Sequence, residues 1–256
     1  MRKATNKNWQ RVTAAAAALA LCAGVLTGCG ASSSTAAGST AASSAAASEV
    51  SSEEADEMAA KNVADLIDAI YVQERNENTD AQCEAAKAAW DALTDAQKEM
   101  VEGEEADPDY FGRDTGDASK DDARNEDNIG DNEILVVSFG TSFNDSRAAD
   151  IKGIEDAIQA AYPDWSVRRA FTAQIIINHV QARDGEKIDN MEQAMERAVA
   201  NGVKNLVVQP THLMHGAEYD EMMEMVDSYR DKFESVAIAE PLLGLSLIHI
   251  SEPTRH

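Results

Sequence analysis

Two histidines and a glutamate lie three residues apart in QPTHLMHGAEYDEM, residues 209–222: His212, His215 and Glu218. The whole chain has only five histidines, so the clustering is unusual. Imidazole nitrogen together with carboxylate oxygen suits divalent cations such as Co²⁺, Ni²⁺ or Fe²⁺. The spacing alone leaves three interpretations open: a complete metal site, part of one, or a chance group of polar residues at the start of a helix.

Four apolar runs predict the strands that would position this stretch: residues 133–139, 165–171, 204–210 and 235–241. The first, EILVVSF, is continuous, as expected for a strand buried on both faces. Helical patterns lie between the runs, and this alternation predicts one parallel sheet with right-handed crossovers. The histidines then fall in the loop after the third strand. Glu218 falls in the first turn of the next helix, where the helix dipole favours a carboxylate.

Ligands of open α/β sheets bind beyond the carboxyl ends of the strands. The loops after the first and third strands, residues 138–142 and 210–216, both lie at that edge. Backbone and hydroxyl donors of the first loop suit substrate carboxylates, although a tight strand-to-helix turn explains the same residues. Arg168 and Arg169 are adjacent on a strand and point to opposite faces, so at most one can contact an acidic substrate. The candidate substrate-binding residues are Ser138, Gly140, Thr141 and Ser142.

Four ordered segments resemble the anaerobic sirohydrochlorin cobaltochelatases: LVVSFGTSFNDSR, RRAFTAQIIINHVQARDG, VVQPTHLMHGAEYDEM and EPLLG. The resemblance covers residues 133–244 and implies a chelatase-like parallel sheet with flanking helices, one half of a two-half α/β fold. That family inserts a divalent metal into a tetrapyrrole, in the cleft between the halves and without ATP. The resemblance therefore implies a lyase-type chelatase of anaerobic cobalamin biosynthesis. Its substrates would be a sirohydrochlorin-like tetrapyrrole and Co²⁺, with Ni²⁺ or Fe²⁺ as alternatives, and no nucleotide would be needed.

The resemblance also implies roles for single residues. The glutamate of the family's Gly-x-Glu-Tyr motif helps to hold the metal, and it corresponds to Glu218. His212 matches a histidine of the same motif and is a catalytic candidate facing the cleft, with a hydrogen-bonded structural histidine as the alternative. The principal histidine ligands of the family come from the second half, and His215 matches no residue of known role. His179 lies amid isoleucines of a helix and is expected at the surface or in packing.

The N-terminus predicts a lipid anchor. A basic stretch, a short apolar run and Leu26-Thr27-Gly28-Cys29 form a secretory signal whose end resembles the lipobox of bacterial lipoproteins. The resemblance implies that residues 1–28 are the signal peptide and that Cys29 carries lipid. Residues 29–52, rich in Ala, Ser and Gly, are expected to form a flexible tether. The predicted location is extracytoplasmic, at the membrane surface through the anchor.

The formal net charge is −24, and it falls to −28 without the signal peptide because four cationic residues leave with it. Such a charge argues against nucleic acid as a partner and against electrostatic binding to anionic lipid head groups. Sirohydrochlorin is itself rich in carboxylates. Local cations must therefore offset the long-range repulsion, or the substrate differs.

Residues 53–102 predict a small all-α module that serves as a spacer or contact element. The sequence Thr94 to Gln97 has the form of a capping box that opens its third helix. Cys83 is expected to be a buried or half-buried thiol without a catalytic role. Residues 103–132 are dominated by Asp and Glu and punctuated by Gly and Pro, which predicts a solvated acidic linker. Tyr110 and Phe111 are the residues of that linker able to pack on a neighbouring domain.

The C-terminal segment 245–256, LSLIHISEPTRH, does not continue the preceding pattern. Residues 245–255 agree with eleven consecutive codons of one reading frame of a transposon-type sequencing adapter. We therefore expect the natural protein to continue past Gly244 with the family's second half and its histidine ligands. The chain as given is expected to have little activity and poor stability.

Two other functions stay open. A surface-anchored protein with this fold could bind a tetrapyrrole or a metal without catalysis, and extracytoplasmic placement favours this alternative because tetrapyrrole synthesis is usually cytoplasmic. A purely structural surface protein is the third option. The number of subunits is also open, and a homo-oligomer is among the choices.

Overall fold

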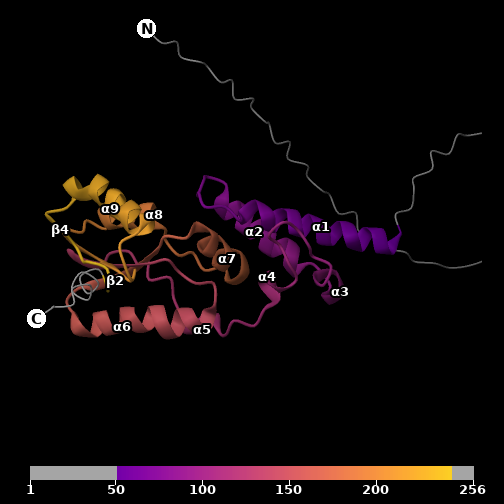
Figure 1. Ribbon diagram of the computed structural model, residues 1–256, viewed down its shortest axis with the longest axis horizontal. Helices are drawn as coiled ribbons and strands as arrows, with labels where there is room; N and C mark the ends of the chain where they lie inside the picture. The colour runs from indigo at the N-terminus through magenta and orange to yellow at the C-terminus, as the bar shows by residue number, and fades with distance from the viewer. Residues whose placement is uncertain (1–50, 244–256) are drawn as a thin grey trace, which may run out of the picture. The chain divides into compact units, whose positions relative to one another are not determined.

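The computed structural model describes residues 51–243, which contain a helical part followed by an α/β part (Figure 1). These residues fall within one compact unit of the chain. The predicted signal peptide, Cys29, nearly all of the predicted tether and the adapter-like segment lie outside the described residues. Within residues 51–243, no helix is long and apolar enough to cross a membrane.

The helical part begins with two longer helices that pack against each other, α1 (Ser52–Ile70) and α2 (Thr79–Asp91). The short helices α3 (Asp95–Lys98) and α4 (Asp109–Gly112) follow. A capping box at Ser51 and Glu54 starts α1, and the predicted box at Thr94 and Gln97 starts α3. Cys83 is fully buried, and burial raises the pKa of its thiol to about 11. The thiol therefore stays protonated and unreactive at neutral pH, as the sequence suggested.

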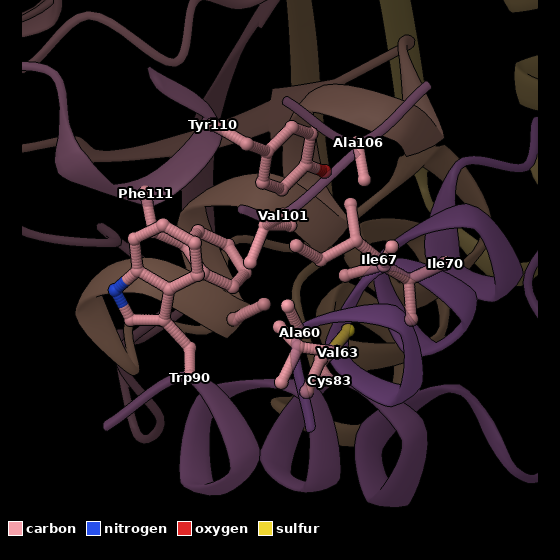
Figure 2. Close-up of a cluster of buried hydrophobic side chains, with 13 residues drawn as sticks. Ala60, Val63, Ile67, Ile70, Cys83, Trp90, Val101, Ala106, Tyr110 and Phe111 are labelled. Atoms are coloured by element: carbon pink, nitrogen blue, oxygen red, sulfur yellow. The ribbon is translucent and has the colours of Figure 1, made fainter. Parts of the chain in front are cut away.

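A single core holds the helical part together (Figure 2). Aliphatic side chains of α1 meet the indole of Trp90, which contacts Phe111 edge to face with ring centroids 5.3 Å apart. Ala182, from a helix of the α/β part, belongs to the same core. The module thus shares its hydrophobic interior with the α/β part and is more than a spacer.

The α/β part contains a four-stranded, all-parallel sheet, as predicted. Its strand order is β2-β1-β3-β4, so β1 lies between β2 and β3. The buried pattern of β1 agrees with a strand covered on both faces. The strands are β1 (Asn132–Ser138), β2 (Ser166–Phe171), β3 (Asn205–Pro210) and β4 (Ser235–Ile238).

Helices cover both faces of the sheet. The short turns α5 (Asn144–Ser146) and η2 (Arg147–Ile151) lead into α6 (Lys152–Ala161) on one face. The other face is covered by α8 (Met191–Ala200) and α9 (Ala217–Tyr229), which is followed by the turn η3 (Arg230–Lys232). Between the sheet and the helical part lies α7 (Gln174–Asp184), which packs against α2.

The burial of α6 does not simply follow its apolar residues. Ile158 packs toward the sheet with Ile134 and Val136, but Ile154 is 41% exposed. Glu155 takes the inward position instead and is fully buried, because its carboxylate accepts two hydrogen bonds from the buried Arg169. A tertiary ion pair therefore rotates the helix away from the face that its apolar residues suggest.

Residues 103–132 are mostly exposed or half-buried, but a few of them are held against the rest of the chain, as the sequence allowed for Tyr110 and Phe111. The first residues of this segment donate three backbone hydrogen bonds to the carboxylate of Asp68 on α1. Tyr110 and Phe111 are buried in the helical core. After the turn η1 (Ala118–Lys120), the side chain of Asp121 is buried against the α/β part. The carboxylate of Asp121 can be buried because arginines of the α/β part pair with it.

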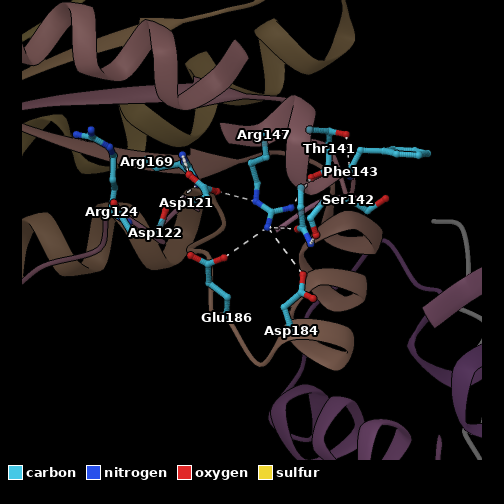
Figure 3. Close-up of polar contacts among 12 residues, drawn as sticks. Asp121, Asp122, Arg124, Thr141, Ser142, Phe143, Arg147, Arg169, Asp184 and Glu186 are labelled. Atoms are coloured by element: carbon cyan, nitrogen blue, oxygen red, sulfur yellow. Dashed lines mark hydrogen bonds and ion pairs between the residues drawn. The ribbon is translucent and has the colours of Figure 1, made fainter. Parts of the chain in front are cut away.

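Asp121 joins two buried arginines (Figure 3). Both of its oxygens accept hydrogen bonds from the guanidinium of Arg169, at 2.7 and 2.8 Å, and one also accepts from Nε of Arg147 at 2.7 Å. Burial alone would raise the pKa of Asp121, but the hydrogen bonds and charges of the two arginines lower it. With Glu155 and the carbonyl oxygen of Asp122, all five N–H donors of Arg169 have acceptors.

Replacing Asp121 by alanine is expected to lower the free energy of unfolding by about 3–5 kcal/mol, because two guanidinium groups lose a buried counter-charge. Urea denaturation followed by circular dichroism measures this change. Glu126→Gln is the matched control, since Glu126 is an exposed carboxylate of the same segment, and its effect should stay within about 0.5 kcal/mol. A loss of less than about 1 kcal/mol in Asp121→Ala would contradict the assigned role.

The ring of His179 stacks on Tyr110 with centroids 4.0 Å apart, and burial lowers its pKa from 6.5 to about 4. Between these values the unfolded chain binds a proton that the folded chain does not bind, so stability falls as the pH drops from 6.5 toward 4. At pH 5 this costs about 2 kcal/mol relative to neutral pH.

Urea denaturation at pH 7 and pH 5 should therefore show a smaller acid-induced loss of stability in His179→Phe than in the unsubstituted chain. Tyr110→Phe keeps the stacked ring and should retain the full loss. Equal pH dependence in His179→Phe and the unsubstituted chain would show that His179 does not carry it.

Candidate functional site

The carboxyl ends of the strands bring the two predicted loops together. The backbone amide of Thr211, just after β3, donates to the carbonyl oxygen of Val137, and its hydroxyl donates to the hydroxyl oxygen of Ser138 at 2.9 Å. The loop after β1 and the loop after β3 are therefore neighbours at one edge of the sheet. This edge is where ligands of open α/β sheets bind.

His212 and Glu218 face each other at this edge. Nε2 of His212 lies 3.9 Å from a carboxylate oxygen of Glu218. The imidazole side chain is only 9% exposed, and neither ring nitrogen has a hydrogen-bond partner among residues 51–243. Burial lowers the pKa of His212, with Glu218 opposing, so the ring is neutral at pH 7. A buried neutral imidazole with a free lone pair is ready to bind a cation.

Glu218 is the more accessible of the two. It lies in the first turn of α9, as predicted, and its side chain is 51% exposed. Gly216 precedes the helix as an N-cap without a side chain, so no side-chain oxygen caps the first amides of α9. The positive end of the helix therefore acts on the carboxylates of this turn.

His215 lies apart from this pair. Its Nε2 is 3.0 Å from the carboxylate of Glu240, beyond β4, and its ring contacts Tyr219 edge to face. Its side chain is exposed. The three residues that stand three apart in the sequence thus divide into one facing pair and one surface histidine.

The loop after β1 is tightly built. Gly140 has φ +101°, and a Cβ atom at this position would lie 2.6 Å from the ring of Phe171, so only glycine fits. The hydroxyl of Ser138 is buried against Thr211, and the hydroxyl oxygen of Thr141 accepts from the next amide but one. The side-chain hydroxyls predicted as donors are therefore partly occupied within the loop.

The backbone of the same loop is different. Among the described residues, the amides of Gly140, Thr141 and Ser142 have no acceptor. The carbonyl oxygens of Thr141 and Ser142 accept hydrogen bonds from Arg147 and Arg183, which fixes the orientation of these peptides. Three amides held in place without acceptors can bind an anionic oxygen, such as a substrate carboxylate.

The guanidinium groups of the two arginines of β2, Arg168 and Arg169, are both paired with carboxylates and are not available to a ligand at this edge. Arg168 is fully buried and pairs with Glu133 at 2.9 Å, while Arg169 is occupied by Asp121 and Glu155. The sequence allowed one of them to contact an acidic substrate, and the structure excludes both. Buried carboxylates from distant parts of the chain are the reason.

Two hollows meet at Glu218. One, of about 460 Å³, includes His212 and the residues around the start of α9. The other, of about 390 Å³, extends from Glu218 and Met222 to Thr172 and Gln174 after β2, and to the loop at Gln73–Arg75 of the helical part. Periodicity and motif spacing could not predict this second hollow, because its walls come from segments about 100 residues apart.

The described residues alone do not complete a metal site. Residues 51–243 contain no group of three or more His, Cys, Asp or Glu side chains arranged to hold a metal ion. His212 and Glu218 supply two donors, one nitrogen and one oxygen. This pair therefore offers part of a coordination shell and leaves the other positions of a cation to water or substrate.

Comparison with known proteins agrees with this geometry. Residues 132–253 match the family Cobalt chelatase (CbiK), a range that overlaps the adapter-like segment. The sirohydrochlorin cobaltochelatase of Salmonella typhimurium is 36% identical over 111 residues, which are 43% of this chain and 42% of that protein. The sirohydrochlorin cobaltochelatase CbiKC of Nitratidesulfovibrio vulgaris is 27% identical over 113 residues, 43% of this chain and 39% of that protein.

The chain spans about two fifths of the length of these curated relatives. The matched residues include the whole sheet, the loop after β1 and the stretch with His212 and Glu218. The helical part lies outside the residues that the family model matches. Over residues 132–253 the chain is therefore similar to the cobalt chelatase (CbiK) family.

Proposed function

We propose that the α/β part binds Co²⁺ and a sirohydrochlorin-like tetrapyrrole and forms one wall of a cleft in which the metal is inserted without a nucleotide. One observation carries the proposal: a buried, neutral His212 without hydrogen-bond partners among the described residues, 3.9 Å from the exposed Glu218 at the ligand-binding edge. The names of the two curated relatives support the choice of substrates.

The pair suits the chemistry of insertion. The metal must shed water while two pyrrole N–H protons leave the macrocycle. An imidazole nitrogen and a carboxylate oxygen can hold the metal with an incomplete shell, and the carboxylate can accept a proton as the metal transfers. The mixed nitrogen and oxygen donors suit Co²⁺, and also Ni²⁺ or Fe²⁺.

A second candidate is a protein that binds a metal or a tetrapyrrole without catalysis. The incomplete donor set within residues 51–243 favours it, because a metal held by two protein groups is held loosely. The two candidates differ in one measurable quantity. Only a chelatase accelerates insertion of Co²⁺ into sirohydrochlorin above the rate without protein.

Glu218→Gln and His212→Ala are each expected to weaken Co²⁺ binding at least about tenfold, the effect seen even for outer-shell partners of metals. Anaerobic calorimetric titration with CoCl₂ measures the affinity. Glu224→Gln, an exposed carboxylate further along α9, is the matched control and should leave it unchanged. Equal affinities in all variants would refute the assignment.

The unsubstituted chain and Glu218→Ala, each mixed anaerobically with sirohydrochlorin and Co²⁺, separate the two candidate functions. A spectral change of the tetrapyrrole that is faster than in the protein-free reaction, and that is lost in Glu218→Ala, supports a chelatase. Binding of both molecules without acceleration supports the second candidate. Failure to bind either molecule would exclude both.

We further propose that Cys29 carries lipid and holds the protein at the outer face of a membrane. The support is the lipobox-like sequence before Cys29 and the Ala, Ser and Gly stretch after it. When a bacterial host that expresses the protein is grown with a labelled fatty acid, the label should be incorporated into the unsubstituted chain and into Cys83→Ser. It should not be incorporated into Cys29→Ser. Equal labelling of Cys29→Ser would contradict the anchor.

A further inference from the structure

The loop between α1 and α2 forms a wall of the larger hollow beside Glu218. Gln73, Glu74 and Arg75 of this loop face the same 390 Å³ hollow as Glu218 and Gln174. The helical part therefore does not end at a distance from the candidate site. It supplies side chains to the space in which a ligand of Glu218 would lie.

The α/β part holds this loop at both ends. The side-chain amide of Asn178, on α7, donates to the carbonyl oxygen of Ile70, the last residue of α1, at 2.8 Å. Gln181, one turn further on α7, donates to Asp80 at 2.8 Å, and Asp80 accepts from Arg75 at 2.7 Å. The position of Arg75 thus depends on α7 through two successive hydrogen bonds.

Arg75 is the only cationic residue among the described residues that line this hollow. The other charged residues there are all carboxylates: Glu74, Glu192, Glu218 and Glu221. A molecule rich in carboxylates would be repelled by these side chains unless a cation met it. Arg75 is the lining residue that can do so.

The guanidinium of Arg75 has donors to spare. Its only hydrogen bond among the described residues uses one N–H, toward Asp80, whereas a guanidinium carries five. Its side chain is 21% exposed, so it is held in place and still accessible. A guanidinium with free, oriented donors binds a carboxylate in a bidentate manner.

We infer that Arg75 binds a carboxylate side chain of the tetrapyrrole, so that the helical module positions the substrate beside Glu218. This inference rests on the proposed function and adds to it a positioning residue from outside the matched domain. Arg75 touches the edge of the substrate and takes no part in the exchange of metal and protons. Its loss therefore changes tetrapyrrole affinity and leaves Co²⁺ affinity intact.

The test is a titration of the chain with metal-free sirohydrochlorin, followed by its absorbance. Arg75→Ala should weaken binding about 10- to 100-fold, the size of a hydrogen bond to a charged group. Arg75→Lys keeps the charge without the planar fork and should lose less. The control is Arg113→Ala, which removes an exposed arginine of the same helical part that pairs with Asp109 outside this hollow. Its affinity should equal that of the unsubstituted chain.

The Co²⁺ titration of the same variants and their thermal midpoints complete the experiment. Unchanged Co²⁺ affinity and an unchanged midpoint in Arg75→Ala show that the loss is specific to the tetrapyrrole. If Arg75→Ala does not fold, Arg75→Gln replaces it, because the glutamine amide can still donate to Asp80.

Equal sirohydrochlorin affinity in Arg75→Ala and the unsubstituted chain would overturn the inference and leave the proposed function standing. An equal loss in Arg113→Ala would also overturn it, since general charge would then explain the effect. Absence of sirohydrochlorin binding by the unsubstituted chain would overturn the proposed function itself, and the inference with it.

Discussion

The carboxylate of Asp121 lies between two guanidinium groups that have no access to water, and much of the α/β part depends on this contact. Arg169 projects from β2 and connects it to Glu155 on α6 and to the segment before β1. Arg147 shares the same anion and holds the carbonyl oxygen of Thr141. A buried charge without a partner costs several kcal/mol of folding free energy, so the loss of one of these elements destabilises the others. The conformation of the loop after β1 therefore depends on this network of ion pairs.

The candidate site combines rigid donors with an open space. Oriented amides after β1, the buried imidazole of His212 and the accessible carboxylate of Glu218 lie on one edge of the sheet. Around them the surface is strongly acidic, which suits a cation and opposes an acidic macrocycle. Such a site needs a few cations at chosen points, and Arg75 provides one from outside the sheet.

Features set by nearby residues could be predicted from the sequence. The capping box at Thr94 and the four strands follow from local sequence patterns, and both are observed. Glu218 was found through a motif. The inward turn of Glu155, the burial of Asp121 and the approach of Arg75 to Glu218 depend on partners 14 to more than 100 residues away. A pattern of neighbouring residues cannot predict contacts with such distant partners, so these features could be seen only in the structure.

The loop from residue 71 to residue 78 starts and ends on buried residues, Ile70 and Thr79, and Asn178 holds the last carbonyl group of α1. Changes in sequence or length between these two points can leave the sheet edge where it is. Loops on a rigid scaffold vary faster than the scaffold in evolution. The hollow beside Glu218 thus has one wall within the residues that match the cobalt chelatase family and another wall, outside them, that is free to diverge. Selection can therefore alter the hollow without altering the sheet edge that carries His212 and Glu218.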